Sequence, residues 1–194
     1  RGLVGSEMCI RDRYNSKILH FLKESTVRPA SEDEMKWSGL EEKSRHFIGY
    51  LDDAPLYAVS VLNEQTMIPD TTFTDLRSLF PVMNMQLFEA ISRAFQIVNW
   101  ADSNQFCGFC GSELKHDEKE RAMKCHNCHA PLVYPKISPC IITLIYKEKS
   151  ILLAHNKNFP ANLYSTIAGF IEAGESAEAC LKREVKEEVG LSLI

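Results

Sequence analysis

Short runs of hydrophobic residues with a two-residue or a helical period predict a mixed α/β fold. Residues 46–62 (HFIGYLDDAPLYAVSVL) predict two strands joined by a turn at 52–55. In the second of these strands, Tyr57, Val59 and Val61 recur at every other position, which is the period of a strand.

A helix is predicted over residues 83–100, because apolar residues there recur every three or four positions. Asn84 stands just before this pattern and is a suitable N-cap. Residues 14–105 therefore form one predicted α/β domain. The apolar face of the helix is expected to consist of Leu87, Ile91, Ala94, Phe95 and Val98.

The pattern after residue 139 predicts strands followed by a helix. Residues 140–146 and 151–155 predict a hairpin, and residues 163–170 predict a further strand that leads into a glycine turn. Residues 176–189 predict a helix that ends at Gly190, a favourable C-cap. Its buried stripe is expected to consist of Ala177, Leu181, Val185 and Val189.

Composition limits the classes of function. The 194 residues carry a net charge of −4, which predicts no general attraction to nucleic acid or to anionic membranes. No apolar run approaches the roughly 20 residues of a membrane helix.

Seven cysteines, four of them in two close pairs, favour a metal and a reducing compartment such as the cytoplasm. Residues 1–13 (RGLVGSEMCIRDR) resemble cloning sequence and are expected to be a non-native leader, so organelle targeting cannot be read.

The segment 106–134 is poor in aliphatic residues, so it needs something other than a hydrophobic core to fold. Its pairs CGFC and CHNC can wrap four thiolates around one tetrahedral ion, and zinc suits four sulfur ligands. Because four cysteines leave no open position, we expect one structural zinc per chain. Two disulfides or four buried free thiols are the alternatives, and His126 or His129 could replace a cysteine ligand. The expected ligands are Cys107, Cys110, Cys125 and Cys128.

Carboxylates cluster in the last predicted helix. Glu184, Glu187 and Glu188 lie at i, i+3 and i+4, so their side chains share one face near the C-terminus of the helix. Like charges repel there, and the helix dipole adds to the cost. Mg²⁺ or Mn²⁺ would relieve this repulsion, because hard divalent cations prefer clustered carboxylate oxygens. The alternative is a solvated acidic face, which many helices have.

The residues from Gly169 through Glu175 to REVKEEVGL (183–191) resemble the Nudix box at every defined position. A four-cysteine ribbon directly before such a box, joined to it by YPKISPCII, is similar to the NADH pyrophosphatase branch of the Nudix hydrolases. The resemblance implies fold class α+β. The expected domains are an N-terminal mixed α/β domain (14–105), a four-cysteine zinc ribbon (106–134) and a truncated Nudix α/β/α sandwich (135–194).

The resemblance also implies a reaction. Its members cleave NADH or NAD to nicotinamide mononucleotide and AMP with Mg²⁺ or Mn²⁺, and some remove NAD caps from RNA. By position, the carbonyl of Ala168 would help the three helix glutamates to hold the catalytic metals. Arg183 would orient a box glutamate through Glu175. Family members are commonly homodimers.

Three residues match positions at the substrate: Tyr134, Phe170 and Gly169, the first residue of the box. For the two aromatic residues, packing in the core is the alternative. No serine or cysteine has an identifiable partner base, so the expected nucleophile is a metal-activated water. His155 could act as a general base, but we expect it to be a surface residue of a strand.

In this branch a signature rich in Pro, Gln and Trp follows the box, and the chain ends at Ile194 before it. We therefore expect a fragment that lacks the last strands and the far helix of the sandwich, with its activity left open. ADP-ribose, a dinucleoside polyphosphate or capped RNA are alternative substrates. The alternative of another class is a non-catalytic zinc-ribbon adapter that binds RNA or protein, although the box keeps all its acidic residues.

Overall fold

The computed structural model describes residues 6–11, 17–21, 27–63 and 65–193, and the chain divides into two compact units. Unit 1 spans Arg1–Lys136 and unit 2 spans Ile137–Ile194. Strands and helices are mixed in both units, as the expected α+β class requires. Each unit is described by itself below.

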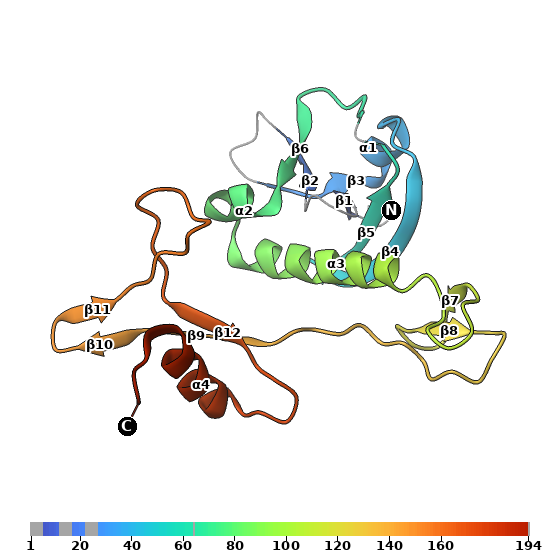
Figure 1. Cartoon of the computed structure of the whole chain (residues 1–194). Coiled ribbons are helices and arrows are strands. Elements are labelled where there is room, and N and C mark those ends of the chain that lie inside the picture. Colours follow the sequence, from blue (N-terminus) through green and yellow to red (C-terminus); the bar gives the residue numbers. More distant parts are fainter. Residues whose placement is uncertain (1–5, 12–16, 22–26, 64, 194) are drawn as a thin grey trace. The chain divides into compact units, whose positions relative to one another are not determined.

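Unit 1 is built around a six-stranded sheet with the order β4-β5-β1-β2-β6, in which β3 also pairs with β1 (Figure 1). All its strand pairs are antiparallel except β1 with β5. Its elements are β1 (Ser6–Arg11), β2 (Lys17–Phe21), β3 (Ala30–Ser31), α1 (Glu32–Trp37), β4 (Glu42–Leu51), β5 (Ala54–Val61), β6 (Thr71–Asp75), α2 (Leu76–Leu79), the 3-10 helix η1 (Phe80–Val82) and α3 (Met85–Ser103).

The predicted strand pair is present as the hairpin of β4 and β5. Its turn residues Asp52 and Asp53 both have positive φ, 49° and 62°, which is the backbone of a type I′ hairpin turn. The alternation of Tyr57, Val59 and Val61 covers one face of β5, and the structure buries residues on both faces of this strand. Leu56 belongs to the core beneath α3, whereas Val59 belongs to a second core on the other side of the sheet.

The predicted helix is confirmed as α3, which runs along the sheet of unit 1 (Figure 1). Asn84 is its N-cap, since its side chain accepts a hydrogen bond from the backbone N–H of Leu87 at 2.8 Å. Phe95 of the predicted face is only partly buried, and Ile97, Trp100 and Ala101 join the core instead. The buried residues of the helix are Leu87, Ile91, Ala94, Ile97, Val98, Trp100 and Ala101.

Part of the expected leader, residues 1–13, lies in the sheet. Ser6–Arg11 forms β1 and pairs with β5 on one side and β2 on the other. A backbone segment can pair in a sheet whether or not it is native, so the non-native origin of residues 1–13 stays a prediction. The first five residues and residues 12–13 lie outside the described part of the chain.

The cysteine-rich segment follows α3 within unit 1. Its two short strands, β7 (Leu114–His116) and β8 (Met123–Cys125), form an antiparallel hairpin in which Leu114 lies opposite Cys125. Leu114 and Met123 are buried in the same hydrophobic core as α3. The segment therefore has a small apolar side that docks on unit 1, in addition to its cysteines.

The described residues of unit 2 form two strand pairs and one helix. Strand β9 (Cys140–Thr143) pairs with β12 (Ile167–Phe170), and β10 (Ile145–Lys147) pairs with β11 (Ser150–Leu152). The predicted hairpin of 140–146 with 151–155 was thus correct only for its second half. Residues 140–143 pair instead with the strand that leads into the glycine turn.

Helix α4 (Ala177–Val189) packs against β12 and β9. Ser176 caps its first turn by accepting a hydrogen bond from the N–H of Ala179 at 3.2 Å, and Gly190 ends it with a φ of +69°. The predicted stripe was partly wrong, because Ala177 is exposed. Cys180 and Val185 are the fully buried residues of this helix.

Candidate functional site

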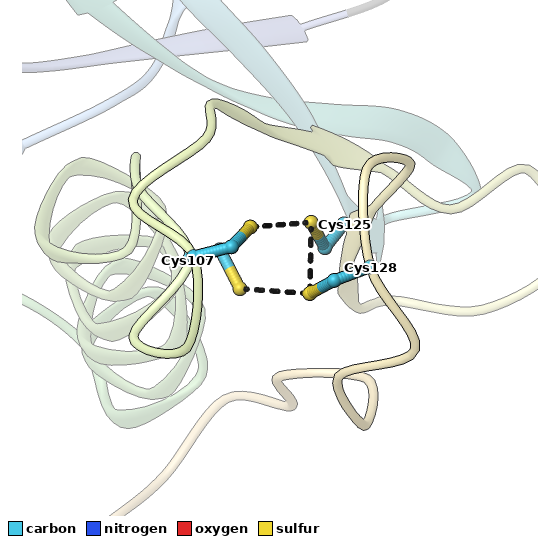
Figure 2. Close-up of side chains that lie close together, drawn as sticks. Cys107, Cys125 and Cys128 are labelled. Atoms are coloured by element: carbon cyan, nitrogen blue, oxygen red, sulfur yellow. Dashed lines mark hydrogen bonds between the residues drawn. The ribbon is translucent and has the colours of Figure 1, made fainter.

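Four cysteines of unit 1 bring their sulfur atoms together. The Sγ atoms of Cys107, Cys110, Cys125 and Cys128 all lie within 4.8 Å of one another. The closest separations join Cys125 to Cys128 at 3.5 Å, Cys110 to Cys125 at 3.6 Å and Cys107 to Cys128 at 3.7 Å. Figure 2 shows the side chains of Cys107, Cys125 and Cys128 pointing toward one another.

These distances exclude the disulfide alternative in this structure, because a disulfide needs an S–S length near 2.05 Å. All four cysteines are free, and Cys110 is exposed, so they are not four buried thiols either. Four soft sulfurs on two loops form the tetrahedral donor set that zinc prefers, and the residues present therefore fit a structural zinc. The neighbouring His126 and His129 are not part of the cluster.

Crowding the sulfurs perturbs their ionisation in opposite directions. Hydrogen bonds from Ser112 lower the pKa of Cys110 to about 6. The pKa of Cys128 is raised to about 12: the backbone N–H of Ala130 acts to lower it, but the sulfur of Cys110, burial and the other sulfurs outweigh that effect. Ionisation of one thiol thus disfavours ionisation of its neighbour, because the two negative charges repel. A cation at the centre of the cluster would allow all four thiols to ionise.

A second constellation lies in unit 2 around Arg183. Its guanidinium donates hydrogen bonds to both oxygens of Glu175, at 2.9 Å each, to Oε1 of Glu184 at 2.8 Å and to Oε2 of Glu187 at 3.1 Å. It also donates to the carbonyl of Phe170 at the end of β12, at 2.9 Å. Arg183 thus contacts Glu175 and two glutamates of the helix, and its role in orienting a box glutamate stays a prediction.

The ion pair with Arg183 is reflected in the pKa of its partners. Hydrogen bonds from Arg183 and from the backbone N–H of Glu172 lower the pKa of Glu175 to about 2. The hydrogen bonds that Arg183 donates to Glu175 and Glu184 raise the pKa of Arg183 further above its usual value. Glu175 therefore stays ionised and available as a fixed anchor for the guanidinium at any ordinary pH.

Glu184 lies directly over Gly169. A Cβ atom added to Gly169 would stand 1.9 Å from Cδ and 2.1 Å from Oε1 of Glu184, so the carboxylate could not keep its present place. The glycine therefore leaves room for the Glu184 side chain against β12 and does not serve an unusual turn. This contact brings the Glu184 carboxylate beside the strand backbone that also carries Ala168.

The three helix glutamates differ in their surroundings. The side chain of Glu184 is only 13% exposed, that of Glu187 is 59% exposed, and Glu188 lies on the exposed surface of α4. Among the described residues, the cysteine cluster is the one group of three or more donors close enough to hold an ion. The three carboxylates thus occupy neighbouring positions on one helix, but their oxygens do not converge on one ion site in this structure. Two of them, Glu184 and Glu187, instead accept hydrogen bonds from Arg183.

Cys180 was missed by the sequence analysis. Its thiol is fully buried and donates to the carbonyl of Phe170 at 3.3 Å, while Nη2 of Arg183 lies 3.6 Å from its sulfur. Burial raises the pKa of Cys180, which keeps the thiol protonated and able to donate. Free cysteine is among the most frequently buried residues, so its presence in α4 was the available signal.

The two predicted nucleotide-facing aromatics lie in different units. Tyr134 belongs to unit 1 and is 46% exposed, and its hydroxyl donates to a carboxylate oxygen of Glu120. Phe170 belongs to unit 2 and is 65% exposed. Neither ring is therefore a core residue of its unit, and the core-packing alternative is wrong for both.

His155 is exposed and stands beside an isolated bridge between Ala154 and Ser165. Its Nδ1 lies 2.8 Å from the carbonyl of Leu163, so the ring donates there. Its ring also contacts those of Phe159 and Tyr164. This setting supports the prediction of a surface residue over that of a general base.

Comparisons with known families divide the chain into three parts. Residues 16–100 match the NADH pyrophosphatase-like rudimentary NUDIX domain, residues 102–131 match the NADH pyrophosphatase zinc ribbon domain, and residues 136–194 match the NUDIX domain. The second match covers the cysteine cluster and the third covers the Arg183 constellation. None of the helices in the described part of the chain is long and apolar enough to cross a membrane.

Similar curated proteins carry the name NAD-capped RNA hydrolase NudC. One from Pseudomonas putida is 38% identical over 161 residues, which are 83% of this chain and 58% of the relative. One from Pseudomonas fluorescens is 39% identical over 159 residues (82% and 57%), and one from Pseudomonas aeruginosa is 37% identical over 150 residues (77% and 53%). The chain thus spans a little over half the length of these relatives. The chain belongs to the Nudix superfamily, in its zinc-ribbon-containing NADH pyrophosphatase branch.

Proposed function

We propose that the protein is a metal-dependent hydrolase that cleaves the pyrophosphate of NADH or NAD to nicotinamide mononucleotide and AMP. The observation that carries the proposal is the Arg183 constellation, in which Glu175, Glu184 and Glu187 meet one guanidinium beside Gly169. The names of the relatives and of the two NADH pyrophosphatase families support the choice of substrate.

The donor set suits Mg²⁺ or Mn²⁺, because both prefer carboxylate and carbonyl oxygens. Glu184, Glu187, Glu188 and the carbonyl of Ala168 would hold the ions. Bound there, the ions would neutralise the substrate's pyrophosphate and lower the pKa of a coordinated water. Until metal binds, the guanidinium of Arg183 pairs with Glu175, Glu184 and Glu187, and this positive charge offsets their mutual repulsion.

Water is the proposed nucleophile. Cys180 has its sulfur buried and hydrogen-bonded to a backbone carbonyl, and a raised pKa keeps it as the less nucleophilic thiol. Glu175 is held as an anion by Arg183, so its role is to fix the guanidinium rather than to shuttle a proton. Within unit 2, the exposed ring of Phe170 would stack on a base of the dinucleotide, with Gly169 at the substrate side of the strand. Tyr134, which belongs to unit 1, stays a proposed substrate contact of its own.

Glu188→Gln in the full-length protein tests the assignment. Losing one carboxylate ligand should lower kcat for NADH cleavage by about 100-fold or more without changing the melting temperature. Glu178→Gln is the matched control, because Glu178 is exposed in the first turn of the same helix. A Glu188→Gln variant with near-normal turnover would refute the role of Glu188.

Removal of NAD caps from RNA is the second part of the proposal, and it rests on the printed name of the relatives. A panel of NADH, NAD, NAD-capped RNA, ADP-ribose and a dinucleoside polyphosphate would rank the substrates. If the protein cleaved only ADP-ribose, the proposed substrate would be wrong, but the proposed metal-dependent hydrolysis of a pyrophosphate would stand. Nucleic-acid binding that persists without divalent metal, together with no cleavage of any substrate, would favour the adapter alternative.

We also propose a homodimer in a reducing compartment such as the cytoplasm. The six cysteines whose side chains the structure describes are all free, which fits such a compartment. Light scattering coupled to size-exclusion chromatography of the full-length protein would give the mass, and twice the monomer mass is expected.

A further inference from the structure

The four cysteines of the zinc ribbon differ in their exposure to solvent. Cys107 and Cys125 are each 5% exposed, and Cys128 is only partly exposed, whereas Cys110 is exposed. All four are thiolates once zinc is bound, because zinc takes deprotonated sulfur as its ligand. Access of a reagent therefore decides which of the four sulfurs reacts first with an oxidant, and Cys110 is the accessible one.

The loop around Cys110 leaves room for a small molecule. A Cβ atom added to Gly108 or to Gly111, which flank the cysteine closely in the chain, would meet nothing within 4 Å. The ring of Phe109 is 80% exposed, so it lies largely in solvent. A molecule as small as a hydroperoxide can thus approach the exposed Cys110.

A second sulfur lies close enough to react with an oxidised Cys110. The Sγ atom of Cys125 is 3.6 Å from that of Cys110, so a small shift of one loop would bring the pair to the 2.05 Å of a disulfide. Cys140 is also exposed, but it lies on β9 of unit 2 and is not part of the sulfur cluster. The ribbon therefore combines an exposed sulfur with a neighbouring sulfur that can resolve its oxidised form.

We propose that Cys110 is a site of reversible oxidation by a hydroperoxide, and that this oxidation opens the zinc ribbon. The thiolate of Cys110 attacks one oxygen of hydrogen peroxide, so an S–O bond forms, the O–O bond breaks and hydroxide leaves. The thiolate of Cys125 then attacks the sulfur of this sulfenic acid, so an S–S bond forms and a second hydroxide leaves. Each hydroxide takes up a proton to give water. The two sulfurs together lose two electrons, and the peroxide gains them.

The disulfide removes two of the four sulfur ligands, so the affinity of the ribbon for zinc falls. Leu114 and Met123 of the ribbon are buried in the same core as Trp100 of α3, and the loss of the folded ribbon therefore loosens unit 1. A thiol reductant reverses the reaction, because it cleaves the disulfide and restores both thiolates. The inference does not depend on the proposed hydrolysis.

The test adds hydrogen peroxide to the full chain in its zinc-loaded form and follows zinc release with a chromogenic dye. Peptide mapping of samples alkylated without reduction should find the first disulfide between Cys110 and Cys125. Dimedone, which traps sulfenic acids, should label Cys110 before the other cysteines of the ribbon. A dithiol reductant with added zinc should restore the original zinc content and melting curve.

Two matched variants separate access to one sulfur from the general loss of a ligand. Cys110→His and Cys107→His each leave three cysteines and one histidine, a ligand set that structural zinc sites also use. Cys110→His should release zinc at least about tenfold more slowly with peroxide, because the exposed thiolate is gone. Cys107→His keeps that thiolate and should release zinc at least as fast as the wild type. Cys140→Ser removes the exposed cysteine of unit 2 and should leave the rate unchanged.

Zinc content before the addition of peroxide shows whether each variant is loaded. If a histidine variant does not hold zinc, the mapping and the dimedone labelling of the unsubstituted chain decide the question. The inference is overturned if the first disulfide lacks Cys110, or if peroxide oxidises Cys140 completely while zinc stays bound. It is also overturned if loaded Cys110→His releases zinc as fast as loaded Cys107→His.

Discussion

Gly169 is the residue on which the geometry of the glutamate site depends most directly. Gly169→Ala would place a methyl group 1.9 Å from the present position of the Glu184 carboxyl carbon, so the carboxylate must move. We expect Mn²⁺ to bind at least about tenfold more weakly, as measured by electron paramagnetic resonance of the free ion. Gly108→Ala is the control, since a Cβ there meets nothing within 4 Å. Equal Mn²⁺ affinities of the two variants would contradict the role of Gly169.

His46 should make folding stability depend on pH. Because its folded pKa of about 4 is below its ordinary value of 6.5, the unfolded chain binds the proton first as pH falls. The stabilisation is therefore present above pH 6.5 and is lost on acidification toward pH 4. We expect a loss of about 2 kcal/mol between about pH 7 and pH 5 in urea unfolding of the zinc-loaded chain. His46→Phe should reduce this dependence, and an unchanged slope would contradict the account.

The site residues could be predicted from the sequence to different degrees. The cysteine spacing alone predicted the sulfur cluster, because two close pairs have few ways to surround one ion. Of the partners of Arg183, only Glu175 was expected from the box motif, whereas its contacts with Glu184 and Glu187 were not predicted. The contact of Glu184 with Gly169 and the burial of Cys180 could not be predicted, since they depend on how closely α4 approaches β12.

Elements with strong local signals were predicted well, and elements fixed by tertiary pairing were not. Helix α3 has a cap and a helical period in its own sequence, whereas the partner of β9 is set by β12, which lies far along the chain. The alternation in β5 predicted a strand, but it did not predict that two separate cores bury its two faces. The two-residue hydrophobic period of a strand does not predict whether a second layer of the protein packs on its other face.

The cap of α4 should contribute measurably to the stability of unit 2. Ser176→Ala removes the acceptor for the N–H of Ala179 and should cost about 1 kcal/mol, seen as faster hydrogen exchange in the first turn of α4. Ser176→Asp keeps an acceptor and adds a favourable charge at the helix N-terminus, so it should match or exceed the wild type. Equal exchange in Ser176→Ala and wild type would show that the cap is dispensable.

Zinc should stabilise unit 1 as a whole, because the ribbon shares a hydrophobic core with α3. Cys107, Leu114, Met123 and Cys125 are buried in the same cluster as Trp100. Removing zinc with a strong chelator should lower the melting temperature by roughly 10 °C and expose Trp100 to solvent. A dye assay should recover one zinc per chain. An unchanged melting curve after complete removal of zinc would contradict a structural role.

Analysis of the products formed from NADH by the full-length protein tests the central claim most directly. Incubation in ¹⁸O-labelled water with Mn²⁺, followed by mass spectrometry, should give nicotinamide mononucleotide and AMP, with one label on a phosphate of one product. No cleavage is expected when Mn²⁺ is chelated under conditions that retain zinc. Release of free nicotinamide, or cleavage at an undiminished rate without divalent metal or with Glu188→Gln, would contradict hydrolysis of the pyrophosphate by metals on the glutamates of α4.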